Sequence, residues 1–186
     1  EYLTAVWNSY QVGADELERY VDIMAQLGAN TATSMEEIAT SMQKVAATAN
    51  TVGVSMEQVS SIIATVSSVT RESAESTGTA FKTIFARMGD LKLGETLEDG
   101  VNLGSISSTL EKIGVHVLDA NGEMRDMGKI IEEVMEKWQL MSRAEQNALA
   151  QVVAGKRQYT QVMALMENDD LYKRSMNLAQ NSEGSL

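Results

Sequence analysis

Apolar residues recur every three or four positions through most of this sequence, which is the spacing of one face of an α-helix. These amphipathic stretches cover residues 14–27, 35–49, 56–66, 80–88, 127–138, 143–154 and 156–168. Each stretch is short and is followed by glycine, asparagine or other polar residues, which are typical of helix ends. The pattern therefore predicts a mainly α protein, a multi-helix bundle of short amphipathic helices.

One phrase occurs twice, as Ser34-Met-Glu-Glu-Ile and as Ser55-Met-Glu-Gln-Val. Each copy is a capping box, in which the serine hydroxyl accepts from the backbone N–H three residues on, where Glu37 or Gln58 stands. Gly53 lies between the copies at the position of a helix end and a turn. We therefore expect a helical hairpin at residues 34–70 rather than one long coiled coil. The unit does not recur elsewhere, so the sequence does not favour a solenoid.

Two more capping boxes follow, Ser108 to Glu111 and Ser142 to Glu145. Each predicts the start of a helix. Gly155 closes the second of these segments, where we expect a left-handed helix C-cap.

The segment around His116 has a different pattern. Val115 and Val117 alternate with His116, and the turn signal Asn121-Gly122 follows. Alternation before such a turn is typical of paired strands. The complete expected fold is thus a helical bundle with one small β-hairpin near residues 115–125.

Residues 91–107 contain three glycines and two acidic clusters and have no sustained period, which indicates a Gly-rich polar linker. The linker separates an N-terminal helical subdomain, residues 1–90 with the helical hairpin 34–70, from a hairpin plus helical subdomain, residues 108–186. Because the sequence has no initiator methionine, we expect it to be a fragment of a longer chain.

Charge and composition narrow the classes of function. The chain has 15 basic and 26 acidic residues and a net charge of -11, which disfavours sequence-specific binding of nucleic acid. It has no cysteine and no proline, which excludes disulfides and favours helices. No apolar run approaches the roughly 20 residues of a membrane-spanning helix, so we expect no membrane segment.

The sequence contains no complete catalytic or metal-binding pattern. His116 is the only histidine, and without cysteine it cannot build a zinc site. A calcium loop with its glycine at Gly122 would place Val117 at the first ligand position, which cannot coordinate an ion. Neighbouring carboxylates such as Glu132 and Glu133 are better explained as a solvated helix face. We therefore expect no catalytic residues, no metal, no cofactor and no enzymatic activity.

The 12 methionines lie mainly within the apolar stripes. Methionine is flexible and adapts to different neighbours. The stripes are consistent with ordinary core packing and with a surface that changes partners during assembly, and the sequence leaves both open.

The segment TRESAESTGTAFKTIFARMGDL, residues 70–91, resembles a motif of phage tail tape-measure proteins. In that motif a Thr-rich turn leads through Gly-Thr into an aromatic helix that ends in Arg-Met. Residues 110–168 are similar to the second half of the same domain, with Trp138 near a helix end and an Ala-Gly-x-Arg-Gln junction at 154–158. The matching motif residues, interpreted as packing positions, are Gly78, Thr79, Phe81, Phe85, Arg87, Met88, Trp138, Gly155, Arg157 and Gln158.

The resemblance implies a structural virion protein of tailed phages, prophages or phage-tail-like particles. It implies a role in tail assembly, tail-length determination and DNA ejection. The implied partners are the tail tube protein, tail assembly chaperones and tail-tip or baseplate hub proteins, with a homo-oligomer, trimer or hexamer, in the tail. The implied location is the virion tail, in its lumen or at one end, and the host cytoplasm during assembly.

Two other classes of function stay open at this point. A stand-alone helical protein-interaction adaptor would have no association with a particle. A cell-wall-degrading module would need a catalytic carboxylate pair or a Cys/His arrangement in a pocket.

Overall fold

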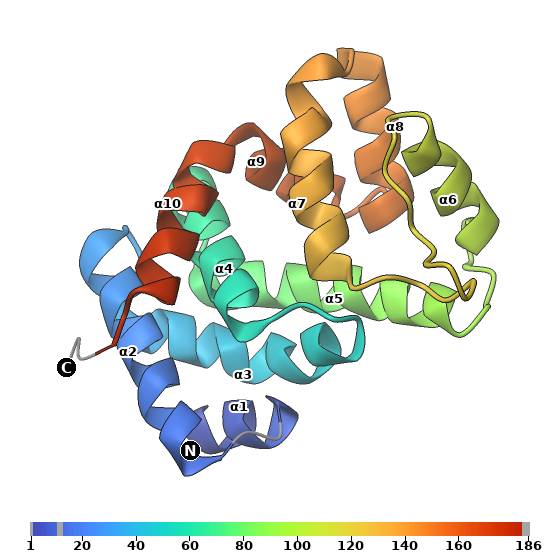
Figure 1. The fold of residues 1–186 in the computed structure, drawn as a ribbon. Coiled ribbons are helices and arrows are strands. Elements are labelled where there is room, and N and C mark those ends of the chain that lie inside the picture. Colours follow the sequence, from blue (N-terminus) through green and yellow to red (C-terminus); the bar gives the residue numbers. More distant parts are fainter. Residues whose placement is uncertain (1, 11–12, 184–186) are drawn as a thin grey trace.

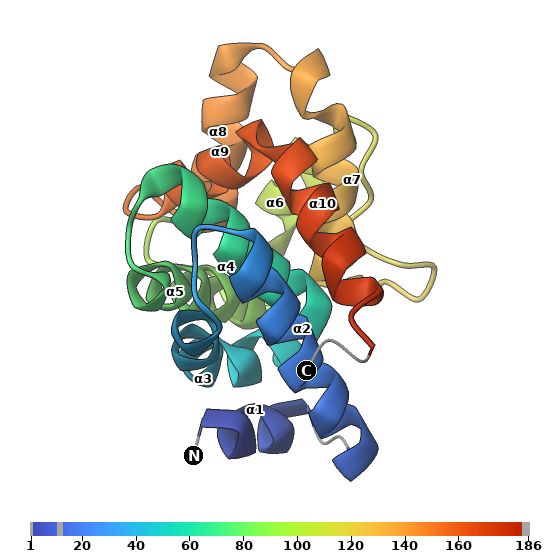
Figure 2. The same ribbon diagram turned by 90° about the vertical axis from the view of Figure 1, so that its left-hand side faces the viewer.

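The computed structural model describes residues 2–10 and 13–183, and most of these residues lie in helices (Figure 1). The helices are α1 (Tyr2–Tyr10), α2 (Ala14–Asn30), α3 (Met35–Thr51), α4 (Met56–Thr70), α5 (Ala74–Lys92), α6 (Leu103–Glu111), α7 (Met127–Lys137), the 3-10 turn η1 (Trp138–Leu140), α8 (Arg143–Ala154), α9 (Tyr159–Glu167) and α10 (Asp169–Gln180). Figures 1 and 2 show α1, α2 and α3 at one end of the molecule and α6, α7 and α8 at the other. Helices α4 and α5 lie between the two ends.

Helix α4 is the central helix, because every residue from Val59 to Ser67 is buried. It contacts α2, α3, α5, α9 and α10. Its serines and threonines are small enough to let several helices approach. Some of their buried hydroxyl groups form hydrogen bonds within α4 or with α5. The Thr65 hydroxyl donates to the Ser61 carbonyl at 2.7 Å, and the Ser67 hydroxyl donates to Thr77 Oγ1 at 3.1 Å.

The capping boxes predicted at Ser34, Ser55 and Ser142 are confirmed, since each serine caps a helix and each partner side chain accepts from the serine N–H. The box predicted at Ser108 is wrong. The N-cap of α6 lies six residues earlier, where the Asn102 side chain accepts from the Ser105 N–H at 2.9 Å. Asparagine is a strong N-cap, and burial of Ile106 and Leu110 on one face anchors the helix from Leu103.

The predicted β-hairpin near residues 115–125 is also wrong. The described residues contain no β-strand, and this segment makes only one isolated antiparallel bridge, between Leu118 and Met124. Val115 and Val117 are buried and His116 is exposed, so the alternation is real. The Asp119 carboxylate holds the turn by accepting from the Asn121 and Glu123 N–H groups at 2.8 and 3.0 Å. Two main-chain bonds join the arms, from the Asp119 N–H to the Glu123 carbonyl and from the Arg125 N–H to the Val117 carbonyl, each at 2.8 Å. The pairing extends no further because the flanking amides of Val115 and Met127 donate to the carbonyls of Leu110 and Val52 instead.

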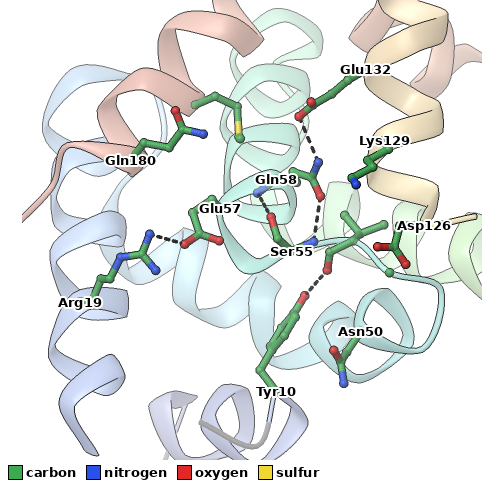
Figure 3. Close-up of a pocket in the computed structure, with 13 residues that line it drawn as sticks. Tyr10, Arg19, Asn50, Ser55, Glu57, Gln58, Asp126, Lys129, Glu132 and Gln180 are labelled. Atoms are coloured by element: carbon green, nitrogen blue, oxygen red, sulfur yellow. Dashed lines mark hydrogen bonds and ion pairs between the residues drawn. The ribbon is translucent and has the colours of Figure 1, made fainter. Parts of the chain in front are cut away.

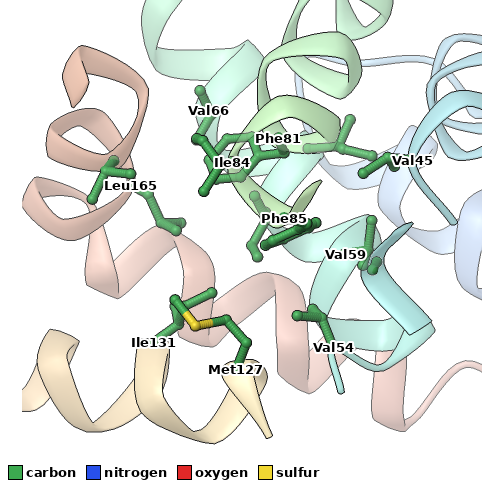
Figure 4. Packing of buried hydrophobic residues seen from close by; sticks show 14 of the residues in the cluster. Val45, Val54, Val59, Val66, Phe81, Ile84, Phe85, Met127, Ile131 and Leu165 are labelled. Carbon is green, nitrogen blue, oxygen red and sulfur yellow. The ribbon is translucent and has the colours of Figure 1, made fainter. Parts of the chain in front are cut away.

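Helix α5 supplies both phenylalanines of the core, Phe81 and Phe85. Figure 4 shows Phe81, Ile84 and Phe85 of α5 among residues of α4, with Met127 and Ile131 of α7 and Leu165 of α9 facing them. The loop 93–102 between α5 and α6 lies within the segment interpreted as a linker. The division of the chain into two subdomains at that segment stays a proposal.

Candidate functional site

A polar cleft of about 610 Å³ opens where α2, α7 and α10 surround the start of α4 (Figure 3). Its floor is held by two contacts. The Tyr10 hydroxyl donates to the Val54 carbonyl at 3.0 Å, which ties α1 to the α3–α4 turn. Arg19 Nη2 lies 2.5 Å from Glu57 Oε1, which ties α2 to the first turn of α4. The cleft is therefore a junction between four segments that are distant in sequence.

Burial affects the tyrosines beside this cleft. Burial is the main cause that raises the pKa of the Tyr10 phenol far above its ordinary value, and the nearby Tyr20 adds to it. Burial likewise raises the pKa of Tyr20 to about 12. The two rings lie 6.5 Å apart in an edge-to-face arrangement. Both phenols therefore keep their protons near neutral pH, and Tyr10 can act as a donor to the turn.

Helix α7 begins against the α3–α4 turn. Its first two N–H groups lack a side-chain cap from Asp126 and instead donate to turn carbonyls, Met127 to Val52 at 2.8 Å and Gly128 to Gly53 at 3.1 Å. The turn thus satisfies donors that a helix start leaves unpaired. Gly128 leaves room for the Gln58 side chain, because a Cβ atom there would overlap the Gln58 amide group.

Glu132 of α7 joins the cleft to α10. Glu132 Oε1 accepts from Gln58 Nε2 at 3.0 Å and from the Tyr172 hydroxyl at 2.9 Å. Burial and the neighbouring Glu132 raise the pKa of Tyr172 well above its ordinary range. The described residues include no group of three or more His, Cys, Asp or Glu that could hold a metal ion. What the cleft offers a partner is charge of both signs and hydrogen-bonding groups.

The motif residues of the sequence fall into three places. The first is the core, where Gly78, Phe81, Phe85, Met88 and Trp138 are all buried. The Phe81 and Phe85 ring centroids lie 5.9 Å apart. Gly78 lets α5 cross α3 closely, since a Cβ atom there would lie 2.1 Å from Ser41 Oγ and 3.0 Å from the Ser41 carbonyl oxygen.

The second place is a polar clamp, which joins Arg87 to the end of α8. Arg87 Nε and Nη2 donate to the Val152 carbonyl at 3.3 and 3.0 Å, and Nη2 lies 2.7 Å from Asp99 Oδ2. A cation at carbonyls that end a helix is favoured by the helix dipole. Gly155 ends α8 beside this guanidinium with φ 76° and ψ 169°. Its φ is positive as predicted, but its ψ is extended, so the left-handed helical conformation that we predicted there is wrong.

The third place is a groove of about 560 Å³ between the start of α5 and the α8–α9 turn. Thr79, Arg157 and Gln158 line it, although 78 residues separate Thr79 from Arg157 in the sequence. The fold therefore brings together three motif residues that the sequence could place only on separate segments.

A family model described as phage-related minor tail protein matches residues 1–155. The chain belongs to this family. Its place is accordingly the phage virion tail, its role there is structural, and its partners are components of the tail. No solved structure matches the chain.

In this minor tail protein the family match ends at Gly155, and helices α9 and α10 follow it. These two helices complete both surfaces, since Met176 and Gln180 of α10 line the cleft and Gln161 of α9 lines the groove. The described helices include none with the length and apolar character needed to cross a membrane.

Sequence reasoning missed three residues that the geometry makes important, and it identified a fourth, Gln58, only as part of a capping box. Ser41 faces Gly78, Gln58 faces Gly128, Asp99 holds Arg87, and Gln161 lies buried beside the groove. Ser41 had a local signal, because it lies at helical spacing, three residues after Ile38, on the apolar face of α3. Asp99 and Gln161 had none, because their partners are remote in sequence.

Proposed function

We propose that this chain is a folded domain of a tape-measure protein, which sets tail length during assembly and leaves the tail when DNA is ejected. The membership of residues 1–155 in the minor tail protein family carries the tail role. The resemblance of residues 70–91 to the tape-measure motif supports the finer assignment. The chain contributes packing and docking surfaces to this role and no catalysis.

The compact helical fold indicates that this chain is not the extended part of a tape measure. A continuous helix of 186 residues would extend about 280 Å at about 1.5 Å per residue. The observed helices are short and cross one another, as Figures 1 and 2 show. We therefore propose a folded region at a tail end or in the lumen, attached to a ruler formed elsewhere. Its proposed partners are the tube protein, the assembly chaperones and the hub, and its proposed assembly is a trimer or hexamer.

Location in the particle is tested by an epitope tag placed in the turn at Asn121-Gly122. Both residues are exposed, and no atom lies within 4 Å of where a Gly122 Cβ would stand, so the fold accommodates an insertion there. Antibody labelling and electron microscopy should place the tag at a tail end, or reveal it only in tails opened by detergent. Free tagged protein of about 20.2 kDa with unlabelled tails would contradict the proposal and favour a stand-alone adaptor.

Tail length itself tests the ruler function. Removing the gene segment for this domain should yield few tails or tails of irregular length, because length control would be uncoupled from assembly. As a matched control, Lys173→Gln changes one exposed residue whose ion pair among the described residues, with Asp169, lies within its own helix. Tails of normal, uniform length without the domain would contradict length control while leaving the family membership intact.

The net charge of -11 fits a lumen through which DNA must slide without binding. Replacing several exposed residues with lysine, away from the cleft and the groove, should therefore slow DNA ejection from intact particles. Ejection measured by release of fluorescent dye-bound DNA at low salt would show the delay most clearly. Unchanged ejection kinetics would remove the support that charge lends to a lumen location.

A further inference from the structure

The groove between the start of α5 and the α8–α9 turn contains an unused buried acceptor. Gln161 is only 7% exposed, and its Oε1 atom has no hydrogen-bond partner among the described residues. Its amide head lies at the groove, because Nε2 donates to Glu72 Oε2 at 3.2 Å and both residues line the groove. A buried acceptor without a donor is unfavourable, because it has lost its bonds to water and has gained none in exchange.

Glu72 lies beside this acceptor and carries a negative charge with no ion-pair partner among the described residues. Its carboxylate accepts only from the Ser76 hydroxyl and from Gln161 Nε2. The second groove carboxylate, Glu75, is paired with Lys44 Nζ at 2.8 Å. The groove therefore holds an exposed carboxylate with no ion-pair partner among the described residues, hydrogen-bonded to a buried amide whose oxygen lacks a donor.

The groove also has features that could attract an anion, namely Arg157 and the first N–H groups of α5. Arg157 is exposed and can bond to water, so it gains little from a ligand. Glu72 and Glu75 lie at the start of α5, where their negative charges complement the dipole of this helix. The same charges repel an anion. The Gln161 oxygen is shielded from water, so the hydrogen bond of a donor that reaches it provides the larger gain.

We propose that this groove binds a cationic side chain, preferably arginine, that another tail protein presents to it. A guanidinium is planar and has several N–H donors, so it can donate to the Glu72 carboxylate and to Gln161 Oε1 at the same time. The surface is then a docking point for a partner with an exposed arginine. This inference does not depend on the tape-measure proposal, because it concerns the groove of the isolated chain.

The probe for the test is N-acetyl-arginine-methylamide, added to the isotope-labelled 186-residue chain. The Gln161 side-chain NH2 signals should shift saturably with the probe. Capped citrulline has the same shape without the charge, and it should bind about tenfold more weakly. Inorganic phosphate should leave the Gln161 signals unchanged. Equal binding of citrulline, binding of phosphate at Gln161, or no saturable shift with arginine would each overturn the proposal.

Three variants assign the groups. Gln161→Met keeps a buried side chain of similar volume without the oxygen, and Glu72→Gln removes the charge from an exposed residue, so each should weaken arginine binding about tenfold. Their backbone spectra serve as the check of folding, and Glu72→Gln keeps the test decisive if the buried substitution perturbs the chain. Arg157→Gln should strengthen arginine binding, since it removes a competing cation. Unchanged arginine affinity in folded Glu72→Gln would overturn the assignment.

Discussion

The two ends of α5 hold the same helix in place by different physical means. Near its start, Gly78 lies against Ser41 in a dry crossing with α3, where the Ser41 hydroxyl donates to the Ala74 carbonyl at 2.6 Å. Near its other end, Arg87 binds a carbonyl and a carboxylate from two other segments. The first contact depends on shape and the second on charge. One motif helix thus combines a rigid packing contact with an ion pair that a change of pH can weaken.

The largest effect is expected from a substitution at the close crossing of α3 and α5. Gly78→Ala places a Cβ atom within 3.2 Å of the Ser41 main chain as well as its hydroxyl, so α3 and α5 must separate. The free energy of unfolding in urea should fall by about 3 kcal/mol.

Gly89→Ala is the matched control on the same helix. Its Cβ atom would meet Val52 Cγ1 at 3.7 Å, an ordinary contact, so it should stabilise the protein by about 0.5 kcal/mol. Equal stability of the two variants would show that the α3–α5 crossing is not close in solution.

The next effect tests the backbone at the clamp. Gly155→Ala puts a side chain on a residue with φ 76° and ψ 169°, a conformation almost confined to glycine, and should destabilise by about 2 kcal/mol. Gly13→Ala is the control, because Gly13 has φ -75° and open space around its Cβ position. Thermal unfolding measures both variants. A neutral or stabilising Gly155→Ala would mean that α8 and α9 are continuous there.

Breaking the charged end should have a smaller effect. Arg87→Gln removes the ion pair with Asp99 and weakens the bonds to the Val152 carbonyl, so the free energy of unfolding should fall by about 1.5 kcal/mol. Hydrogen exchange in the loop 93–102 should also accelerate. Lys92→Gln, which removes an exposed bond to the Thr51 carbonyl, serves as the control and should change stability by less than about 0.5 kcal/mol. Unchanged exchange in Arg87→Gln would contradict the clamp.

The smallest effect sharpens the comparison through pH. The hydrogen bond from Arg87 is the main cause that lowers the pKa of Asp99. Because the pKa of Asp99 is lower in the folded state, its ionised carboxylate stabilises the fold at pH values above the pKa in the unfolded chain, about 4. This stabilisation is lost as the pH falls through the pKa of Asp99 in the folded state. Because 41% of the Asp99 side chain is exposed, the advantage over Asp99→Asn should be only about 0.5 kcal/mol at pH 7.

The measurement is the difference in unfolding free energy between the wild type and Asp99→Asn from pH 7 down to pH 3. The difference should disappear at the acidic end and be absent throughout in an Arg87→Gln background. A difference that grows as the pH falls would have the wrong sign for this clamp.

Local patterns predicted the helices where neighbouring residues were sufficient. Ser34, Ser55 and Ser142 each cap a helix, because a capping box is complete within four residues. The same rule failed at Ser108, where Asn102 offered an earlier cap and buried Ile106 lies ahead of the serine. A capping box thus predicts the start of a helix only when the burial of apolar residues does not favour an earlier or later start.

The candidate surfaces show the same limit. The sequence identified Arg87 and Gly155 as motif residues but could not place them together, and it gave no sign that Asp99 would be the partner. The predicted β-hairpin failed because the amides that flank it, those of Val115 and Met127, donate to the carbonyls of Leu110 and Val52 rather than across the hairpin. Which acceptor an amide finds depends on the tertiary packing, which alternation does not encode.

By itself the sequence determined the helical periodicity, most helix starts, the acidic balance and the resemblance to a tail protein, because these properties depend on composition or on residues a few positions apart. Only the tertiary structure decided that Gly78 faces Ser41, that α7 starts on the α3–α4 turn, and that Glu72 and Gln161 share a groove. These pairs are separated by tens of residues, and the packing of buried faces, rather than any local signal, determines which of them meet.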